Sequence, residues 1–126
     1  MTRILIVDDE PTIRSSMAAM LRMENYQVST ASDGREALDG ALQQPPDLII
    51  TDYNMPRMNG QQLLEALRAE PATACVPVLM LSGNVTRADA PAGGAVTANA
   101  ALVKPFTRAQ LLSALQTLLA SSAPSA

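Results

Sequence analysis

The chain has 126 residues, and its composition, 48% apolar and 17% charged, is typical of one globular domain rather than of a disordered segment. A net charge of -3 without a basic stripe argues against direct nucleic-acid binding by this domain. Histidine is absent and Cys75 is the only cysteine, which excludes a disulfide framework, a Cys/His zinc site, a Ser-His-Asp triad and a phosphohistidine on this chain.

Short apolar runs alternate with helical patterns along the chain. Continuous apolar runs of this length are typical of parallel strands buried on both faces, and apolar residues at helical spacing indicate helices. In chain order we expect a strand at 3–7, a helix at 11–23, a strand at 26–31, a helix at 34–42, a strand at 47–51, a helix at 60–69, strands at 76–81 and 100–103, and a helix at 107–119.

Three of these helices start at residues that favour a helix terminus. Pro11 stands at the first helical position of the first helix. Asp33 precedes the second helix with Glu36 three residues later, which is the spacing of a capping box. Thr107 is a typical capping residue for the last helix.

The sulfur-containing side chains fit a packing role better than a chemical one. Met17, Met20 and Met23 share a helical stripe that is expected to belong to the core. Cys75 precedes a buried strand and is expected to behave as a small apolar residue.

The apolar runs are far shorter than the ~20 residues of a membrane span, and acidic residues follow the first run at once, unlike a signal peptide. We therefore expect no membrane contact and a cytoplasmic location.

Strand–helix alternation at this spacing predicts an α/β domain built from right-handed βαβ units. We expect a flavodoxin-like, doubly wound sheet of five parallel strands in the order 2-1-3-4-5, with helices on both faces. The segment 86–99 would hold a fourth helix, but Pro91, Gly93 and Gly94 predict a short or irregular one. That segment is either ordinary surface or a mobile element beside a site. Residues 121–126 are expected to form a disordered tail or a linker stub.

Polar side chains stand at the carboxyl ends of four predicted strands, where open parallel sheets bind their ligands. They are Asp8 and Asp9, Asp52, Ser82, and Lys104, the only lysine. Each alone has an ordinary explanation, such as a turn or a polar helix start. Ordinary turns do not, however, explain why suitable polar side chains stand at the ends of four separate strands. Three converging carboxylates require a hard cation such as Mg²⁺, and a lysine opposite them would pair with a phosphoryl oxygen.

With these residues in place, the chain resembles the receiver domains of two-component response regulators over residues 3–120. The resemblance rests on four motifs in order: Ile-Leu-Ile-Val-Asp-Asp-Glu at 4–10, Asp-Leu-Ile-Ile-Thr-Asp-Tyr-Asn-Met-Pro-Arg-Met-Asn-Gly at 47–60, Leu-Ser-Gly at 81–83 and Val-Lys-Pro-Phe at 103–106. One motif is weak evidence, whereas four at family spacing are specific. The resemblance implies a receiver domain at 1–120.

The resemblance also implies roles for the acidic residues. Asp52 is the expected phospho-acceptor, taking a phosphoryl group from a sensor histidine kinase or a histidine phosphotransfer protein. Asp8, Asp9, Asp52 and the backbone carbonyl of Asn54 are the expected ligands of Mg²⁺ (or Mn²⁺). Phosphorylation is expected to shift the domain between two conformations and so to signal to an unidentified partner or a C-terminal output domain. The domain is expected to be a switch that catalyses its own phosphorylation and dephosphorylation rather than an enzyme.

The residues expected to bind the phosphoryl group follow the family pattern, but a position near them does not. The resemblance implies that Ser82 and Lys104 bind the phosphoryl group and that the bond before Pro105 is cis. The family usually carries an aromatic residue three positions before the lysine, where this chain has Ala101. The usual aromatic coupling is therefore not expected here, and the output is expected to use another face or an order change of residues 86–99.

Two other classes of function compete with the switch. One is a Mg²⁺-dependent phosphohydrolase that works through an aspartyl phosphate, but Asn54 stands where its second acid would be wanted and no segment is long enough for a substrate cap. The other is a nucleotide-binding module, which lacks both common glycine-rich phosphate motifs here.

Overall fold

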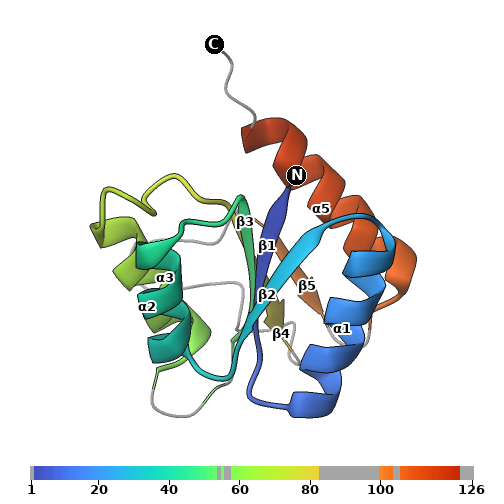
Figure 1. Ribbon diagram of the computed structural model, residues 1–126, viewed down its shortest axis with the longest axis horizontal. Coiled ribbons are helices and arrows are strands. Elements are labelled where there is room, and N and C mark those ends of the chain that lie inside the picture. Colours follow the sequence, from blue (N-terminus) through green and yellow to red (C-terminus); the bar gives the residue numbers. More distant parts are fainter. Residues whose placement is uncertain (1, 54, 56–57, 83–99, 104–105, 123–126) are drawn as a thin grey trace.

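A computed structural model describes residues 2–53, 55, 58–82, 100–103 and 106–122 (Figure 1). In chain order its elements are β1 (Arg3–Val7), α1 (Pro11–Met23), β2 (Gln27–Ala31), α2 (Gly34–Gln43), β3 (Leu48–Asp52), α3 (Gly60–Ala69), β4 (Val78–Ser82), β5 (Ala100–Val103) and α5 (Arg108–Ser122).

The five strands form one sheet in the order β2-β1-β3-β4-β5, and every neighbouring pair is parallel. This confirms the predicted flavodoxin-like topology. Strand β1 pairs with β2 on one side and with β3 on the other, so the winding of the chain reverses between β1 and β3. The carboxyl ends of these two strands are therefore where this kind of sheet offers a ligand crevice.

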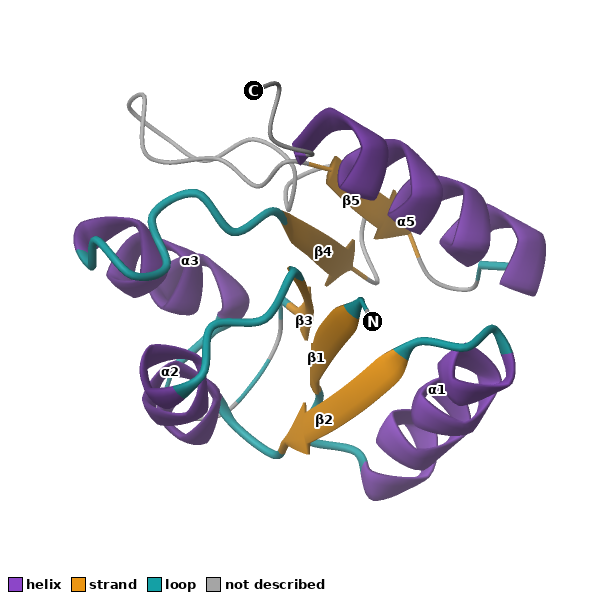
Figure 2. Cartoon of the chain, turned by 45° about the horizontal axis from the view of Figure 1, so that its top comes forward, coloured by secondary structure: helices purple, strands orange, loops and turns teal. Residues whose placement is uncertain are grey.

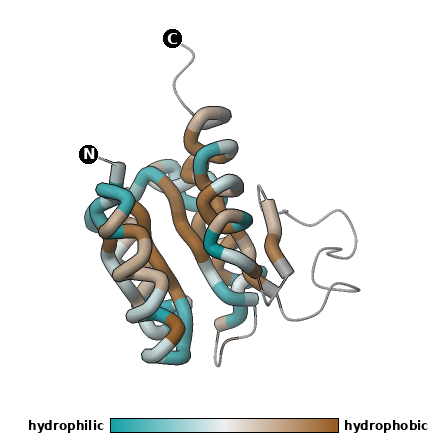
Figure 3. Tube along the Cα trace, turned by 90° about the vertical axis from the view of Figure 1, so that its right-hand side faces the viewer, coloured by the Kyte–Doolittle hydropathy of each residue, from teal (hydrophilic) through white to brown (hydrophobic). Residues whose placement is uncertain are grey.

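Helices cover the sheet on both faces, as Figures 1 and 2 show: α1 and α5 lie on one side, and α2 and α3 on the other. Alternate residues of each strand point to opposite faces. In β1, Ile4 and Ile6 join the cluster under α1 and α5, whereas Leu5 and Val7 join the cluster under α2 and α3. Both clusters are apolar, and the central strands are coloured hydrophobic along most of their length in Figure 3.

The predicted helix caps form, with one shift. The Oδ1 atom of Asp33 accepts the backbone N–H of Glu36 at 2.8 Å. The Glu36 carboxylate, however, accepts from the N–H and hydroxyl of Ser32, at 2.9 and 2.7 Å, instead of closing a box on Asp33. Thr107 caps the last helix through a reciprocal pair of bonds with Gln110, at 3.0 and 2.8 Å.

Several element ends differ from the prediction. Strand β3 includes Asp52 because this residue still pairs with Leu81 in the ladder. Helix α5 extends to Ser122, which is two residues into the segment predicted as a tail. Met17 is buried, but Met23 in the last turn of α1 is 73% exposed. The expectation that Met23 belongs to the core was therefore wrong, and Cys75, expected to behave as a small apolar residue, is exposed as well.

The predicted short or irregular fourth helix at 86–99 lies outside the described residues.

None of the described helices is long and apolar enough to span a membrane.

Candidate functional site

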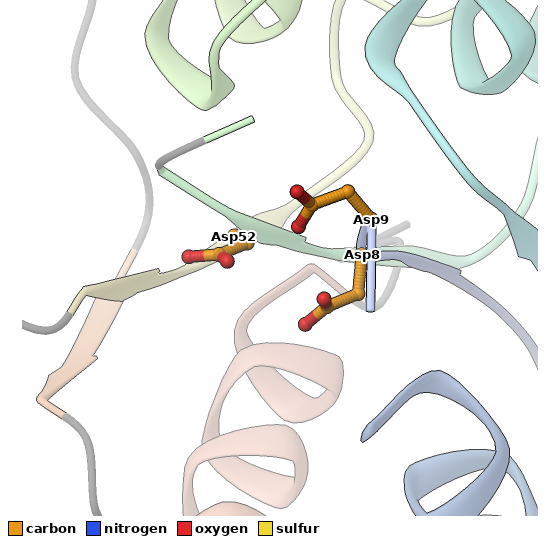
Figure 4. A group of neighbouring side chains, drawn as sticks. All are labelled: Asp8, Asp9 and Asp52. Atoms are coloured by element: carbon orange, nitrogen blue, oxygen red, sulfur yellow. The ribbon is translucent and has the colours of Figure 1, made fainter. Parts of the chain in front are cut away.

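Three carboxylates meet at the carboxyl ends of β1 and β3. Asp8 is fully buried, Asp52 is 7% exposed, and Asp9 lies at the surface. One oxygen from each lies within 4.8 Å of the others. Figure 4 shows the three side chains extending to the same side of the chain. The ladder explains the meeting: Val7 pairs with Thr51, so the residues that follow, Asp8 and Asp52, leave adjacent strands at the same level.

Asp8 is held by bonds to its main chain and its side chain. Its N–H donates to the carbonyl of Ala31 at 3.2 Å, just where β2 ends. Its Oδ1 accepts the N–H of Glu10 at 2.8 Å, and its carbonyl accepts the Nη1 of Arg14 at 2.6 Å. The orientation of the buried carboxylate is therefore set by the start of α1.

Asp52 is positioned by the close return of the chain onto β3. The N–H of Tyr53 donates to the carbonyl of Leu81 at 2.8 Å, and the N–H of Gly60 donates to the carbonyl of Tyr53 at 2.9 Å. A Cβ added to Gly60 would lie 2.6 Å from the backbone oxygen of Asp52 and 2.6 Å from the Sδ of Met80. The first residue of α3 must therefore be glycine for the helix to start this close to the acidic strand end.

The donor set fits a small, hard divalent cation. Two ionised carboxylate oxygens no more than 4.8 Å apart repel by at least about 3.5 kcal/mol at an effective dielectric constant of about 20. A divalent ion reverses that sign, and carboxylate oxygens are the ligands that Mg²⁺ takes in proteins. Since histidine is absent from the chain and Cys75 is remote in sequence from the acids, the set does not resemble a zinc site.

Of the other predicted site residues, the structure describes only some. Ser82 is the last residue of β4, and its backbone pairs with Val103, which puts the ends of β4 and β5 beside the end of β3. Asn54, Lys104 and Pro105 lie outside the described residues.

The position three before the lysine can be placed. Ala101 pairs with Met80 and is exposed, whereas its neighbours Ala100 and Leu102 pack against the core on the α5 side. The alternation of the strand thus turns Ala101 to the opposite face of the sheet from α5.

Arg14 was not among the residues predicted for the site. This side chain is half-buried and reaches back from α1 to the acidic loop. The available signal was its position, since it stands one turn into the helix that directly follows the acidic pair.

Comparisons with known proteins agree on one family. The family described as "Response regulator receiver domain" matches residues 4–116. The transcriptional regulatory protein PrrA of Mycobacterium leprae is 41% identical over 117 residues, which are 93% of this chain and 49% of that protein. The regulatory protein SphR of Synechococcus elongatus, named for alkaline phosphatase synthesis, is 36% identical over 96% of this chain and 50% of its own length. The chain thus spans about half the length of these relatives.

Solved structures give the same answer. The chemotaxis protein CheY4 of Vibrio cholerae superposes with a TM-score of 0.87 at 40% identity, covering 94% of this chain and 98% of that one. The receiver domain of the sensor histidine kinase PA1611 of Pseudomonas aeruginosa has a TM-score of 0.85 at 32% identity, with the same coverage. That structure is described as holding a magnesium ion coordinated in its active-site cleft.

Proposed function

Because this chain belongs to the response regulator receiver family, we propose that it is a phosphorylation-controlled switch whose phospho-acceptor is Asp52. The observation that carries the proposal is the position of this carboxylate. It is 7% exposed at the end of β3, with an oxygen within 4.8 Å of oxygens from Asp8 and Asp9. Family membership makes the domain a signalling switch rather than a metabolic enzyme.

In the proposed step, a carboxylate oxygen of Asp52 attacks the phosphorus of a phosphodonor in line with the bond that breaks. The new P–O bond forms as the P–N bond of phosphohistidine, or the P–O bond of acetyl phosphate, breaks. The departing imidazole or acetate keeps the electron pair. Asp8 and Asp9 take no part in bond making, and their role is to hold charge beside the attacking oxygen.

We propose Mg²⁺ as the cation, with Mn²⁺ able to replace it. The proposed ligands are Asp8 directly or through water, Asp9, Asp52 and the backbone carbonyl of Asn54. When bound, the ion neutralises the carboxylates and the phosphoryl oxygens. The donor chemistry described above supports this choice, as does the magnesium reported for the related Pseudomonas receiver domain.

Ser82 and Lys104 are proposed to bind the transferred phosphoryl group, which would bias the domain towards one of two conformations. The end of β4 beside the end of β3 supports the role of Ser82. The donor is proposed to be a sensor histidine kinase or a histidine phosphotransfer protein. The output is proposed to be a partner or a further domain, which fits relatives named as transcriptional regulators and about twice this length. Loss of the phosphoryl group by autohydrolysis belongs to the same proposal.

The test is incubation with acetyl phosphate and Mg²⁺, followed by intact mass measurement. The parent chain is expected to gain one phosphoryl group that is stable in acid and labile in base. Asp52→Asn should gain none, because an amide is not a nucleophile.

Asp47→Asn is the matched control, because Asp47 precedes the same strand at its opposite end, where it accepts the N–H of Arg3 at 2.7 Å. It should be phosphorylated like the parent chain. Normal labelling of Asp52→Asn would place the acceptor elsewhere. Repeated turnover of a substrate with little adduct would favour a phosphohydrolase.

A further inference from the structure

Asp8, Glu10 and Arg14 form a closed set of contacts at the start of α1. The Asp8 carboxylate accepts the N–H of Glu10 at 2.8 Å, and the carbonyl of Glu10 accepts the N–H of Arg14 at 3.0 Å. The Arg14 side chain then returns to the carbonyl of Asp8, with Nη1 at 2.6 Å. One residue of the helix thus closes a ring that begins and ends at a buried carboxylate residue.

The carbonyl that Arg14 holds belongs to the peptide between Asp8 and Asp9. The peptide on the other side of Asp8 is held by the bond from its N–H to Ala31, at 3.2 Å. With both peptides held, the direction in which Asp9 leaves the chain is also restricted, although Asp9 itself lies at the surface. A guanidinium suits this task because its planar donors have fixed directions and it keeps its charge when half-buried.

We propose that Arg14 is a positioning residue that presets the peptide between Asp8 and Asp9 for binding of a divalent cation. This inference rests on the proposed function, which supplies the Mg²⁺ site. It adds to that site a residue that touches neither the ion nor the phosphoryl group. Outer contacts of this kind orient the ligands before the ion arrives.

The charge of Arg14 and its hydrogen bond act on cation affinity with opposite signs. A positive charge next to three acids repels an incoming cation, so its removal alone would tighten Mg²⁺ binding. The hydrogen bond orders the ligands, so its removal alone would weaken binding. The sign of the change therefore separates positioning from simple electrostatics, and a merely structural role would change stability without changing affinity.

The experiment measures the dissociation constant of Mg²⁺ alone by isothermal titration calorimetry, without a phosphodonor, on folded variants checked by circular dichroism. Arg14→Met is expected to weaken Mg²⁺ binding about three- to tenfold, because loss of a hydrogen bond from a charged donor costs about tenfold or more and loss of the opposing positive charge offsets part of that cost. Arg14→Lys, which keeps the charge and one donor, should recover part of the loss. In both variants, the phosphorylation rate with acetyl phosphate should approach that of the parent at saturating Mg²⁺.

Arg22→Met is the matched control. Arg22 lies on the same helix and also donates to a backbone carbonyl, that of Val28 at 3.3 Å, but at the amino end of β2. Its Mg²⁺ affinity should stay within about twofold of the parent's, since a long exposed bond contributes little.

Unchanged or tighter Mg²⁺ binding by Arg14→Met would overturn the positioning role while leaving the proposed function standing. If that variant does not fold, Arg14→Lys decides: affinity and rate equal to the parent's at every Mg²⁺ concentration would overturn the role. A parent chain that binds no Mg²⁺ at millimolar concentration would overturn both the role and the cation part of the proposed function.

Discussion

Adding a single methyl group at Gly60 should damage the domain and its site together. In Gly60→Ala the new Cβ would lie 2.6 Å from the backbone oxygen of Asp52, 2.6 Å from the Sδ of Met80 and 3.0 Å from the Cα of Tyr53. Two of these three atoms belong to the backbone, which cannot swing aside as the end of a flexible side chain can. The start of α3 must therefore move away from the end of β3.

The cost follows from these contacts. Overpacking of this kind destabilises proteins by about 1–3 kcal/mol. The better helix propensity of alanine recovers at most about 1 kcal/mol of that, and less at the first helical position than in a helix interior. We therefore expect a net loss of about 1–2 kcal/mol, together with weaker Mg²⁺ binding and slower phosphorylation, because the shifted backbone is that of Asp52.

Gly40→Ala is the matched control. Gly40 is an exposed residue inside α2 where an added Cβ meets nothing within 4 Å, and it lines a hollow of about 250 Å³ between α2 and β2. The same substitution there should stabilise the domain by about 0.5–1 kcal/mol through helix propensity.

Urea unfolding followed by far-ultraviolet circular dichroism measures both variants, and the free energies of unfolding are compared with the parent's. Opposite signs are expected. If Gly60→Ala proves as stable as Gly40→Ala and binds Mg²⁺ normally, the close approach of α3 to β3 does not position the site.

Three further predictions concern local bonds and the cation. Asp33→Ala removes the acceptor for the N–H of Glu36 and should cost about 1 kcal/mol in urea unfolding, while a cost below about 0.3 kcal/mol would argue against the cap. The N–H and then the hydroxyl of Ser32 lower the pKa of Glu36 below its ordinary value of 4.5, so Ser32→Ala should raise it part of the way back in an NMR titration, and an unchanged pKa would refute the hydroxyl's role. The stabilisation from Glu36 is fully present above pH 4.5 and is lost as the pH falls through the lowered pKa. Removal of Mg²⁺ with a chelator, from about ten times its dissociation constant, should lower the free energy of unfolding by about 1.4 kcal/mol, and an unchanged midpoint would contradict a native-state cation site.

The sequence was sufficient to predict the sheet and the meeting of the acids. Continuous apolar runs identify buried parallel strands, and Asp8 and Asp52 follow two of those runs directly. Parallel pairing of β1 with β3 then brings the two strand ends to one edge. These are consequences of burial and chain order, which a pattern of residue types records well.

What the sequence did not predict depends on the path of individual side chains. In the sequence, Arg14 looks like an ordinary polar residue on the surface of a helix. Only the three-dimensional path of the chain between β1 and α1 brings its side chain to the carbonyl of Asp8. Met23 and Cys75 have apolar character, but Met23 is the last residue of α1 and Cys75 lies in the turn between α3 and β4, and both are exposed. Glu36 had the spacing for a bond to Asp33, yet Ser32 offers two donors to the same oxygen.

Chemical localisation of the phosphoryl group is the sharpest test of Asp52 as the phospho-acceptor. The chain is phosphorylated with acetyl phosphate and Mg²⁺ and then treated with borohydride, which reduces an aspartyl phosphate to homoserine. Peptide mass spectrometry locates the converted residue. We expect homoserine at Asp52 alone and none when Mg²⁺ is withheld. Homoserine at Asp8 or Asp9 instead, or a phosphoryl group on a serine or threonine, would contradict it.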